Sequence, residues 1–168
     1  MSWIRSALVA TAVMGMALAA AGCGPAQQPS ARPSASSAAP GISALAADYL
    51  AIARPANHRL DVEVSAYEKN ARRDLAAAAA ALRAQAATEH RFDRRLAAIP
   101  FPPAIAATAA ALIGVNEVRA RLTDQQAAVT SIPALLSLAG RHKAADAEVE
   151  AQVRVIRTEL GLPPPESS

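Results

Sequence analysis

The feature that most restricts the fold of this chain is a helical repeat of apolar residues near its end. Apolar side chains recur there at intervals of three and four residues, with one histidine in the series: Leu135, Leu138, His142, Ala145, Val149, Val153, Ile156 and Leu160. Such intervals place side chains on one face of an α-helix. An apolar helix face must be covered by other elements, so the remaining segments decide the architecture.

The composition favours helices in those segments as well. Alanine is the dominant residue, and aromatic residues make up only 3% of the chain. Alanine has the highest helix propensity, followed by Leu, Arg, Gln and Glu, which are also frequent here. The β-branched and aromatic residues that favour strands are sparse. The sequence therefore predicts an all-α protein.

Four segments have the helical period, and proline-rich or polar turns separate the last three. The predicted helices cover residues 43–69, 71–98, 103–129 and 132–160. We expect Ser43 and Asn70 to cap the first two, Pro100-Phe101-Pro102-Pro103 to separate the second from the third, and Gly161 to end the fourth in a left-handed turn. Short connections make consecutive helices antiparallel neighbours, so the prediction is an up-down four-helix bundle.

Pro55 lies inside the first predicted helix. Proline removes one backbone hydrogen bond and clashes with the preceding turn, so we expect a kink or a break near residues 52–54. A kink has two interpretations. It either opens a pocket for a small apolar ligand, lined by Tyr49, Ile52 and Leu60, or only curves the helix around its neighbours.

Three polar residues fall on the apolar faces of the predicted helices: Glu89, Asn116 and His142. On the third helix the apolar face passes through Val115 or Asn116, and then through Val118 or Arg119. The three polar residues could converge into a buried polar cluster that binds a ligand. Alternatively, each reaches water at the edge of its face, or a pair satisfies itself by hydrogen bonding. A hydrolase-type enzyme would require Glu89 and His142 to lie within hydrogen-bond reach of each other or of one water.

No motif in the sequence indicates catalysis, a cofactor or a metal. There is no Gly-x-Ser-x-Gly turn and no phosphate-binding loop. No Glu is followed three residues later by His, as dinuclear metal sites in bundles require. The histidines His58, His90 and His142 fall in three different segments, and the neighbours Glu89 and His90 should point to different faces. We therefore expect no enzyme, no cofactor and no metal site.

The charge balance argues against nucleic-acid binding. The chain has 17 Lys and Arg residues against 14 Asp and Glu residues, and the two signs are interleaved along the predicted helices. Nucleic-acid-binding domains present a basic patch, often with aromatic residues that stack on bases. Neither feature is found in this sequence.

The ends of the chain differ from the predicted bundle. Residues 1–22 have the parts of an export signal: a basic Arg5, an apolar run and then small residues. Residues 23–41 are rich in Pro, Ser, Ala and Gln and predict a disordered tether. We expect the folded domain over residues 42–162 and a short tail over residues 163–168.

The signal ends in Leu-Ala-Ala-Ala-Gly-Cys, which contains Cys23, the single cysteine of the chain. Ala20-Ala21-Gly22-Cys23 resembles the lipobox of bacterial lipoproteins, although Leu is commoner than Ala at the position of Ala20. The resemblance implies cleavage between Gly22 and Cys23, acylation of Cys23 with chains such as palmitate, and an extracytoplasmic protein anchored by lipid to the plasma membrane. The alternative is a secretory signal cut near Ala21, which would leave a free thiol in an oxidising compartment.

In layout and composition the whole chain resembles the small Ala- and Arg-rich helical lipoproteins of actinobacteria. This resemblance carries over no functional residue. It implies a protein of the cell surface. We expect a non-enzymatic interaction or binding module whose partners are the membrane, through the lipid on Cys23, and a protein or other component of the cell envelope. A carrier or sensor of a small apolar ligand near Pro55 is the alternative, and a hydrolase that uses Glu89 and His142 is a further one. The sequence does not determine the oligomeric state.

Overall fold

The computed structural model describes residues 40–165, and these residues form helices without any strand. The helices are α1 (Ile42–Asn70), α2 (Leu75–Ala97), α3 (Pro103–Ala127), α4 (Ile132–Ser137) and α5 (Ala139–Glu159). The predictions for the export signal and for Cys23 fall on residues 1–39, outside the described part of the chain. The prediction of an all-α protein is confirmed.

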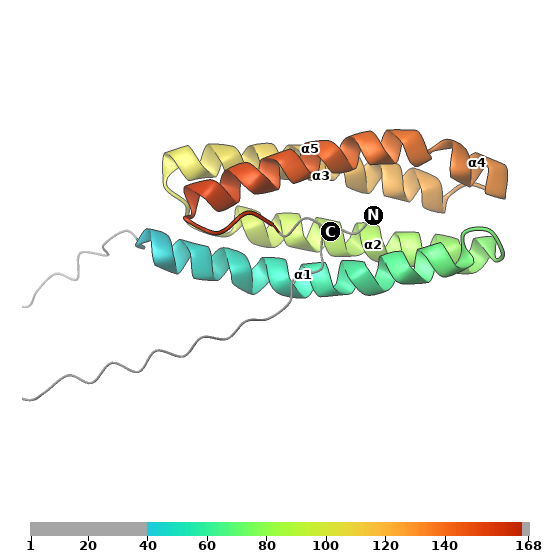
Figure 1. Cartoon of the computed structure of the whole chain (residues 1–168), viewed down its shortest axis with the longest axis horizontal. Coiled ribbons are helices and arrows are strands. Elements are labelled where there is room, and N and C mark those ends of the chain that lie inside the picture. Colours follow the sequence, from blue (N-terminus) through green and yellow to red (C-terminus); the bar gives the residue numbers. More distant parts are fainter. Residues whose placement is uncertain (1–39, 166–168) are drawn as a thin grey trace, which may run out of the picture. The chain divides into compact units, whose positions relative to one another are not determined.

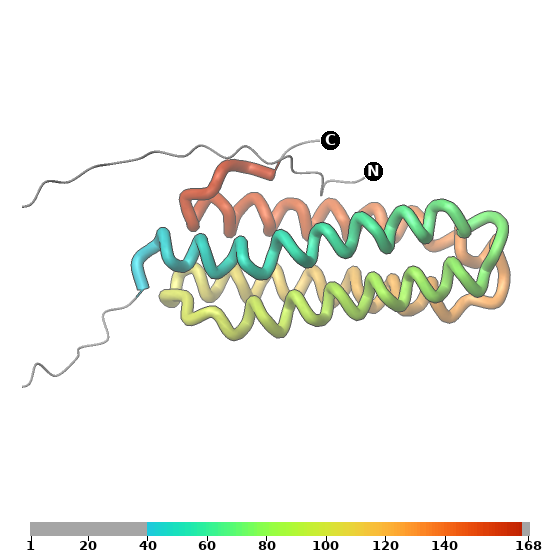
Figure 2. The backbone as a smooth tube through the Cα atoms, turned by 90° about the horizontal axis from the view of Figure 1, so that it is seen from below, coloured from blue at the N-terminus to red at the C-terminus, as the bar shows by residue number. Residues whose placement is uncertain are grey.

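The four long helices pack in the order of the sequence. α1 packs against α2, α2 against α3, and α3 against α5, as Figure 1 shows. In Figure 2, α1 and α5 form the upper pair of helices, and α2 and α3 form the lower pair. This is the predicted up-down four-helix bundle. The seam between α1 and α5 is the side of the bundle with almost no close approach of the two backbones.

The first two helix starts differ from the predicted ones. Ser43 lies inside α1, which starts after Gly41 without a side-chain cap. Asn70 is the last residue of α1, and its side-chain amide donates to the Ala66 carbonyl (2.8 Å). Asp74 caps α2 instead, where its Oδ1 accepts a hydrogen bond from the Ala77 amide (2.9 Å). Residues 71–73 form a turn, so α2 begins four residues later than predicted.

Pro55 does not break α1. The helix runs as one element of 29 residues with Pro55 inside it. Pro55 is exposed, while Ile52 and Ala53 in the preceding turn are buried in the core. Packing of that turn against the rest of the bundle offsets the hydrogen bond that the proline removes. α1 is therefore not broken near residues 52–54, and the other form of the expectation, a kink there, stays a prediction.

The fourth predicted helix consists of two helices in the structure. α4 ends at Ser137, α5 begins at Ala139, and Leu138 lies between them. Ser131 caps α4, and its side-chain oxygen accepts from the Ala134 amide (3.3 Å). Gly140 lies within α5 and does not cause the interruption. Gly161 has a φ of 65°, so the left-handed turn predicted after the helix is confirmed.

Two apolar clusters fill the bundle at different levels. The larger one, which we call the end cluster, is centred on fully buried residues of α1, α2, α3 and α5: Leu45, Leu96, Leu112 and Ile156. The smaller one contains Ala78, Leu82 and Leu135 near the α1–α2 turn and α4. Phe101, in the α2–α3 connection, packs against the end cluster. Within the described residues, none of the helices has the length and hydropathy needed to cross a membrane.

Candidate functional site

Polar side chains occupy the bundle between the two apolar clusters. Five of them are buried on α2 and α3. The other two belong to α5 and are partly exposed. We call this set the polar layer; its members are Gln85, Glu89, Arg119, Thr123, Gln126, His142 and Asp146. Buried polar groups are costly unless they pair with one another, so the contacts within this layer decide what it can do.

Glu89 and Arg119 form the centre of the polar layer. Arg119 Nη2 lies 3.2 Å from Glu89 Oε1, and the side chains of both are almost fully buried. Gln85 Nε2 donates to the same oxygen at 3.4 Å. Burial raises the pKa of Glu89 above its usual value, and the Arg119 guanidinium opposes that shift. The other carboxylate oxygen, Oε2, is buried and accepts no hydrogen bond from any described residue.

α5 adds His142 and Asp146 to this pair. Asp146 Oδ1 lies 3.7 Å from Arg119 Nη1, and its Oδ2 lies 3.3 Å from His142 Nδ1. The other ring nitrogen of His142, Nε2, is joined by a hydrogen bond to Thr123 Oγ1 at 2.9 Å. The ion pairs and hydrogen bonds therefore link α2, α3 and α5 through one connected set of polar groups.

The three polar residues singled out in the sequence do not form one mutual cluster. Glu89 and His142 make no direct hydrogen bond within the described residues, and they are connected through Arg119 and Asp146. Asn116 turns toward Asp93 instead, and its Nδ2 donates to Asp93 Oδ1 at 2.9 Å.

Asp93 is itself buried, and burial raises its pKa to about 7. The hydrogen bond from Asn116 lowers that pKa, while the negative charges of Glu117 and Glu89 raise it further. Asp93 and Asn116 thus form a second buried polar pair next to the polar layer.

Arg119 is the central residue that the sequence analysis left unresolved. The apolar face of α3 could pass through Val118 or Arg119, and hydrophobicity alone favours the valine. In the structure Val118 is 46% exposed and Arg119 only 5%. The signal that favours Arg119 is its position three residues after Asn116, which continues the stripe from Leu112.

A cavity of about 370 Å³ lies along the open seam between α1 and α5. We call it the α1/α5 groove. One wall is Leu60, Asp61, Val64, Tyr67 and Glu68 of α1, and the other is Ala139, His142, Lys143 and Asp146 of α5. Its floor is Leu82, Gln85, Glu89, Arg119 and Gln126 of α2 and α3. The polar layer is therefore the floor and one edge of a groove.

A second cavity lies beside the first, toward the end cluster. It has a volume of about 60 Å³, and Tyr49 and Leu60 line it, whereas Ile52 and Pro55 do not. Pro165, near the end of the chain, also borders it, and Arg157 Nε donates a hydrogen bond to the Pro163 carbonyl (2.7 Å). Ligand pockets usually have volumes of about 300–1,000 Å³. The space near Pro55 is thus much smaller than a usual ligand pocket, and the larger cavity lies farther along α1.

Comparison of the chain with family models, with curated proteins and with solved structures gave no match. Function has to be inferred from the residues of this chain.

Proposed function

We propose that this protein is a lipid-anchored, non-enzymatic binding module on the outer face of a bacterial plasma membrane. Its α1/α5 groove would hold a small amphipathic molecule with an apolar body and a cationic head. The observation that carries the proposal is the cavity of about 370 Å³ along the seam where the described helices α1 and α5 make almost no close backbone approach. That volume falls within the usual range for ligand sites.

The apolar body of the ligand would lie against the α1 side of the groove. Leu60, Val64 and Tyr67 follow one another at three- and four-residue intervals along that wall, and Leu82 continues the apolar surface onto the floor. A four-helix bundle without a ligand would bury these side chains against the facing helix. Here α5 stands away from α1, so an apolar ligand segment can supply the missing contact.

The charges around the groove favour a cationic head. Four carboxylate side chains line it, from Asp61, Glu68, Glu89 and Asp146, against the two cationic side chains of Arg119 and Lys143. Glu89 in addition has the buried oxygen that accepts no hydrogen bond from the described part of the chain. A ligand ammonium group would be attracted by the excess of negative charge and would supply a donor to that carboxylate.

The residues of the groove support binding rather than catalysis. Among residues 40–165, no Ser or Cys lines the groove, and the one histidine that does is held between Thr123 and Asp146. Glu89 is held by Arg119 and Gln85. A hydrolase that uses Glu89 and His142 would need these two groups to act together on one reactant. Each of the two side chains is bonded to other side chains instead.

The anchor is the second part of the proposal, and its support is the lipobox-like sequence that ends in Cys23. Two or three acyl chains on this residue would hold the bundle stably at the membrane, since one chain alone binds only marginally. The Cys23→Ser variant, made in an acylating host, should lose the lipid mass and move from the detergent phase to the aqueous phase. A wild-type chain without lipid would contradict the localisation.

The groove is tested by titrating the full chain with two probes that share one tail, decylammonium and decyl sulfate, below their micelle-forming concentrations. We expect the cationic probe to bind more tightly. Ala139→Trp, which fills the α5 wall of the groove, should abolish that binding. Ala147→Trp on the exposed side of α5 is the matched control and should leave it unchanged. Equal binding of both probes, or binding that survives Ala139→Trp, would contradict the proposal.

A further inference from the structure

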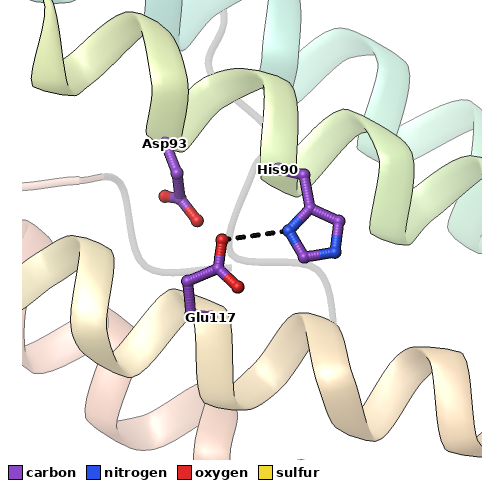
Figure 3. Close-up of side chains that lie close together, drawn as sticks. All are labelled: His90, Asp93 and Glu117. Atoms are coloured by element: carbon purple, nitrogen blue, oxygen red, sulfur yellow. Dashed lines mark hydrogen bonds and ion pairs between the residues drawn. The ribbon is translucent and has the colours of Figure 1, made fainter.

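A group of three potential metal-binding side chains lies between α2 and α3, on the side of the bundle opposite the α1/α5 groove. His90 and Asp93 are three residues apart on α2, and therefore share one face of that helix. Glu117 faces them from α3. Figure 3 shows the three side chains directed toward a common point between the two helices.

The distances suit coordination of one ion. His90 Nδ1 lies 3.0 Å from Glu117 Oε1, and one potential ligand atom from each of the three residues lies within 4.8 Å of the others. Zinc bonds to imidazole nitrogen and carboxylate oxygen are about 2.0–2.2 Å long, so the ligand atoms around one ion lie about 3–3.6 Å apart. Small side-chain rotations would bring the three residues to that geometry.

Each of the three side chains is also held from outside by a second polar group. Asn116 Nδ2 donates to Asp93 Oδ1 at 2.9 Å. Asp124 Oδ2 lies 3.7 Å from His90 Nε2, and Arg121 Nη1 lies 3.9 Å from Glu117 Oε2. Metal-binding histidines and carboxylates are commonly oriented in this way by partners on their remaining atoms.

The second carboxylate oxygen of Asp93 also favours a bound cation. Asp93 is only 3% exposed, and its Oδ2 is buried without a hydrogen-bond partner in the described chain. A buried carboxylate oxygen without a donor is costly. Asp93 also lies near two other carboxylates, Glu117 and Glu89, which add to the negative charge around it. A cation between Asp93 and Glu117 would offset both costs.

We propose that His90, Asp93 and Glu117 bind one divalent first-row transition-metal ion, with Zn²⁺ as the reference ion. One imidazole nitrogen and two carboxylate oxygens suit this class of ion better than Mg²⁺ or Ca²⁺, which prefer oxygen ligands throughout. Water would complete the coordination, since His90 and Glu117 are partly exposed. The ion would cross-link α2 and α3, independently of any ligand in the groove.

The test is a titration of the full-length chain, stripped with a chelator, with Zn²⁺ alone. We expect one equivalent to bind, and we expect Glu117→Gln and His90→Gln each to weaken binding by at least tenfold. The side chains of His90 and Glu117 are both partly exposed, so these variants should fold. Glu150→Gln is the matched control, because Glu150 is equally exposed and pairs with Arg154 four residues later, as Glu117 does with Arg121. His58→Gln is the control for the histidine.

Co²⁺ provides a readout that depends on coordination. Its visible spectrum should change when it binds the wild-type chain, and this change should be lost in His90→Gln and kept in His58→Gln. Asn116→Ala should weaken Zn²⁺ binding by about tenfold through loss of orientation of Asp93. Binding of less than one equivalent, or equal affinity in the ligand and control variants, would contradict the metal site. His90 and Glu117 would then form only an ion pair beside Asp93.

Discussion

The end cluster and the polar layer are two levels of the same bundle, and they bury side chains in opposite ways. At the end, Leu45, Leu96 and Leu112 are buried among apolar neighbours from all four long helices. In the middle, Glu89 and Arg119 are as deeply buried but must satisfy charge with charge. Burial of apolar side chains stabilises the end cluster and requires no polar partner. A buried ion pair often stabilises a protein no more than apolar residues of the same size would.

This difference coincides with the opening of the bundle. At the end cluster, the tail and the apolar faces cover the seam between α1 and α5, and the cavity there is about 60 Å³. Along the polar layer the same seam holds about 370 Å³. We infer from this difference that the end cluster maintains the fold, and we propose that the polar layer serves binding.

The largest effect should come from breaking the ion pair in the polar layer. Arg119→Met leaves the buried Glu89 carboxylate without its cation, and removal of one partner of a buried pair typically costs about 3–5 kcal/mol. We expect a loss of that size in the free energy of unfolding at neutral pH, measured by urea denaturation. Arg121→Met, at an exposed position on the same helix, is the control. Equal stability of the two variants would mean that the buried pair of Arg119 and Glu89 does not contribute to the stability of the fold.

Truncation of the end cluster should have a comparable or slightly smaller effect. Leu112 is fully buried, and Leu→Ala at such positions typically costs about 2–5 kcal/mol. Val118→Ala, at a position 46% exposed on the same helix, should cost less than about 0.5 kcal/mol. The two unfolding free energies, measured side by side, would sharpen the comparison. A small cost for Leu112→Ala would mean that the end cluster does not hold the fold.

Two glycines allow a smaller test at each level. Gly161 ends α5 at the end cluster with φ at 65°, so Gly161→Ala should destabilise the protein by about 1–2 kcal/mol. Gly140 lies within α5 next to the groove, and nothing lies within 4 Å of an added Cβ at either position. Gly140→Ala should therefore stabilise the protein by about 0.5–1 kcal/mol. Thermal unfolding of both variants checks the opposite signs.

The smallest effect concerns pH. Glu63 of α1 accepts a hydrogen bond from Thr88 Oγ1 (2.9 Å), but burial raises its pKa. Because the folded state holds the proton more tightly, the contribution of Glu63 to stability is complete below its unfolded pKa and decreases as pH rises through the folded one. Glu63→Gln should lack this decrease. Parallel pH profiles of the two unfolding free energies would contradict the pKa shift.

Periodicity was sufficient to predict the four helical segments of the bundle, because three- and four-residue spacing reports directly on which side of a helix is buried. The ends of the helices were harder to predict. Asp74 and Asn70 are both good caps, and the turn between α1 and α2 decides between them. The interruption at Leu138 has no glycine or proline at that position to announce it.

The candidate site was only partly predictable. Glu89 and Asn116 stand out because they are polar residues on apolar faces, and both are buried. Arg119 has an apolar neighbour, Val118, that competes for the same stripe. The group of His90, Asp93 and Glu117 joins residues of two helices, and only the spacing of His90 and Asp93 is visible along one of them. The groove depends on how far α5 stands from α1, which no local pattern encodes.

The most direct test of the account replaces the central pair of the polar layer by apolar residues, in the variant Glu89→Leu/Arg119→Met. Native mass spectrometry of the wild-type chain, purified gently from an acylating host, should show a bound molecule in addition to the acylated protein. We expect the double variant to be at least as stable as the wild type but to have lost that molecule. A double variant that keeps the bound mass, or that unfolds while Leu112→Ala does not, would contradict it.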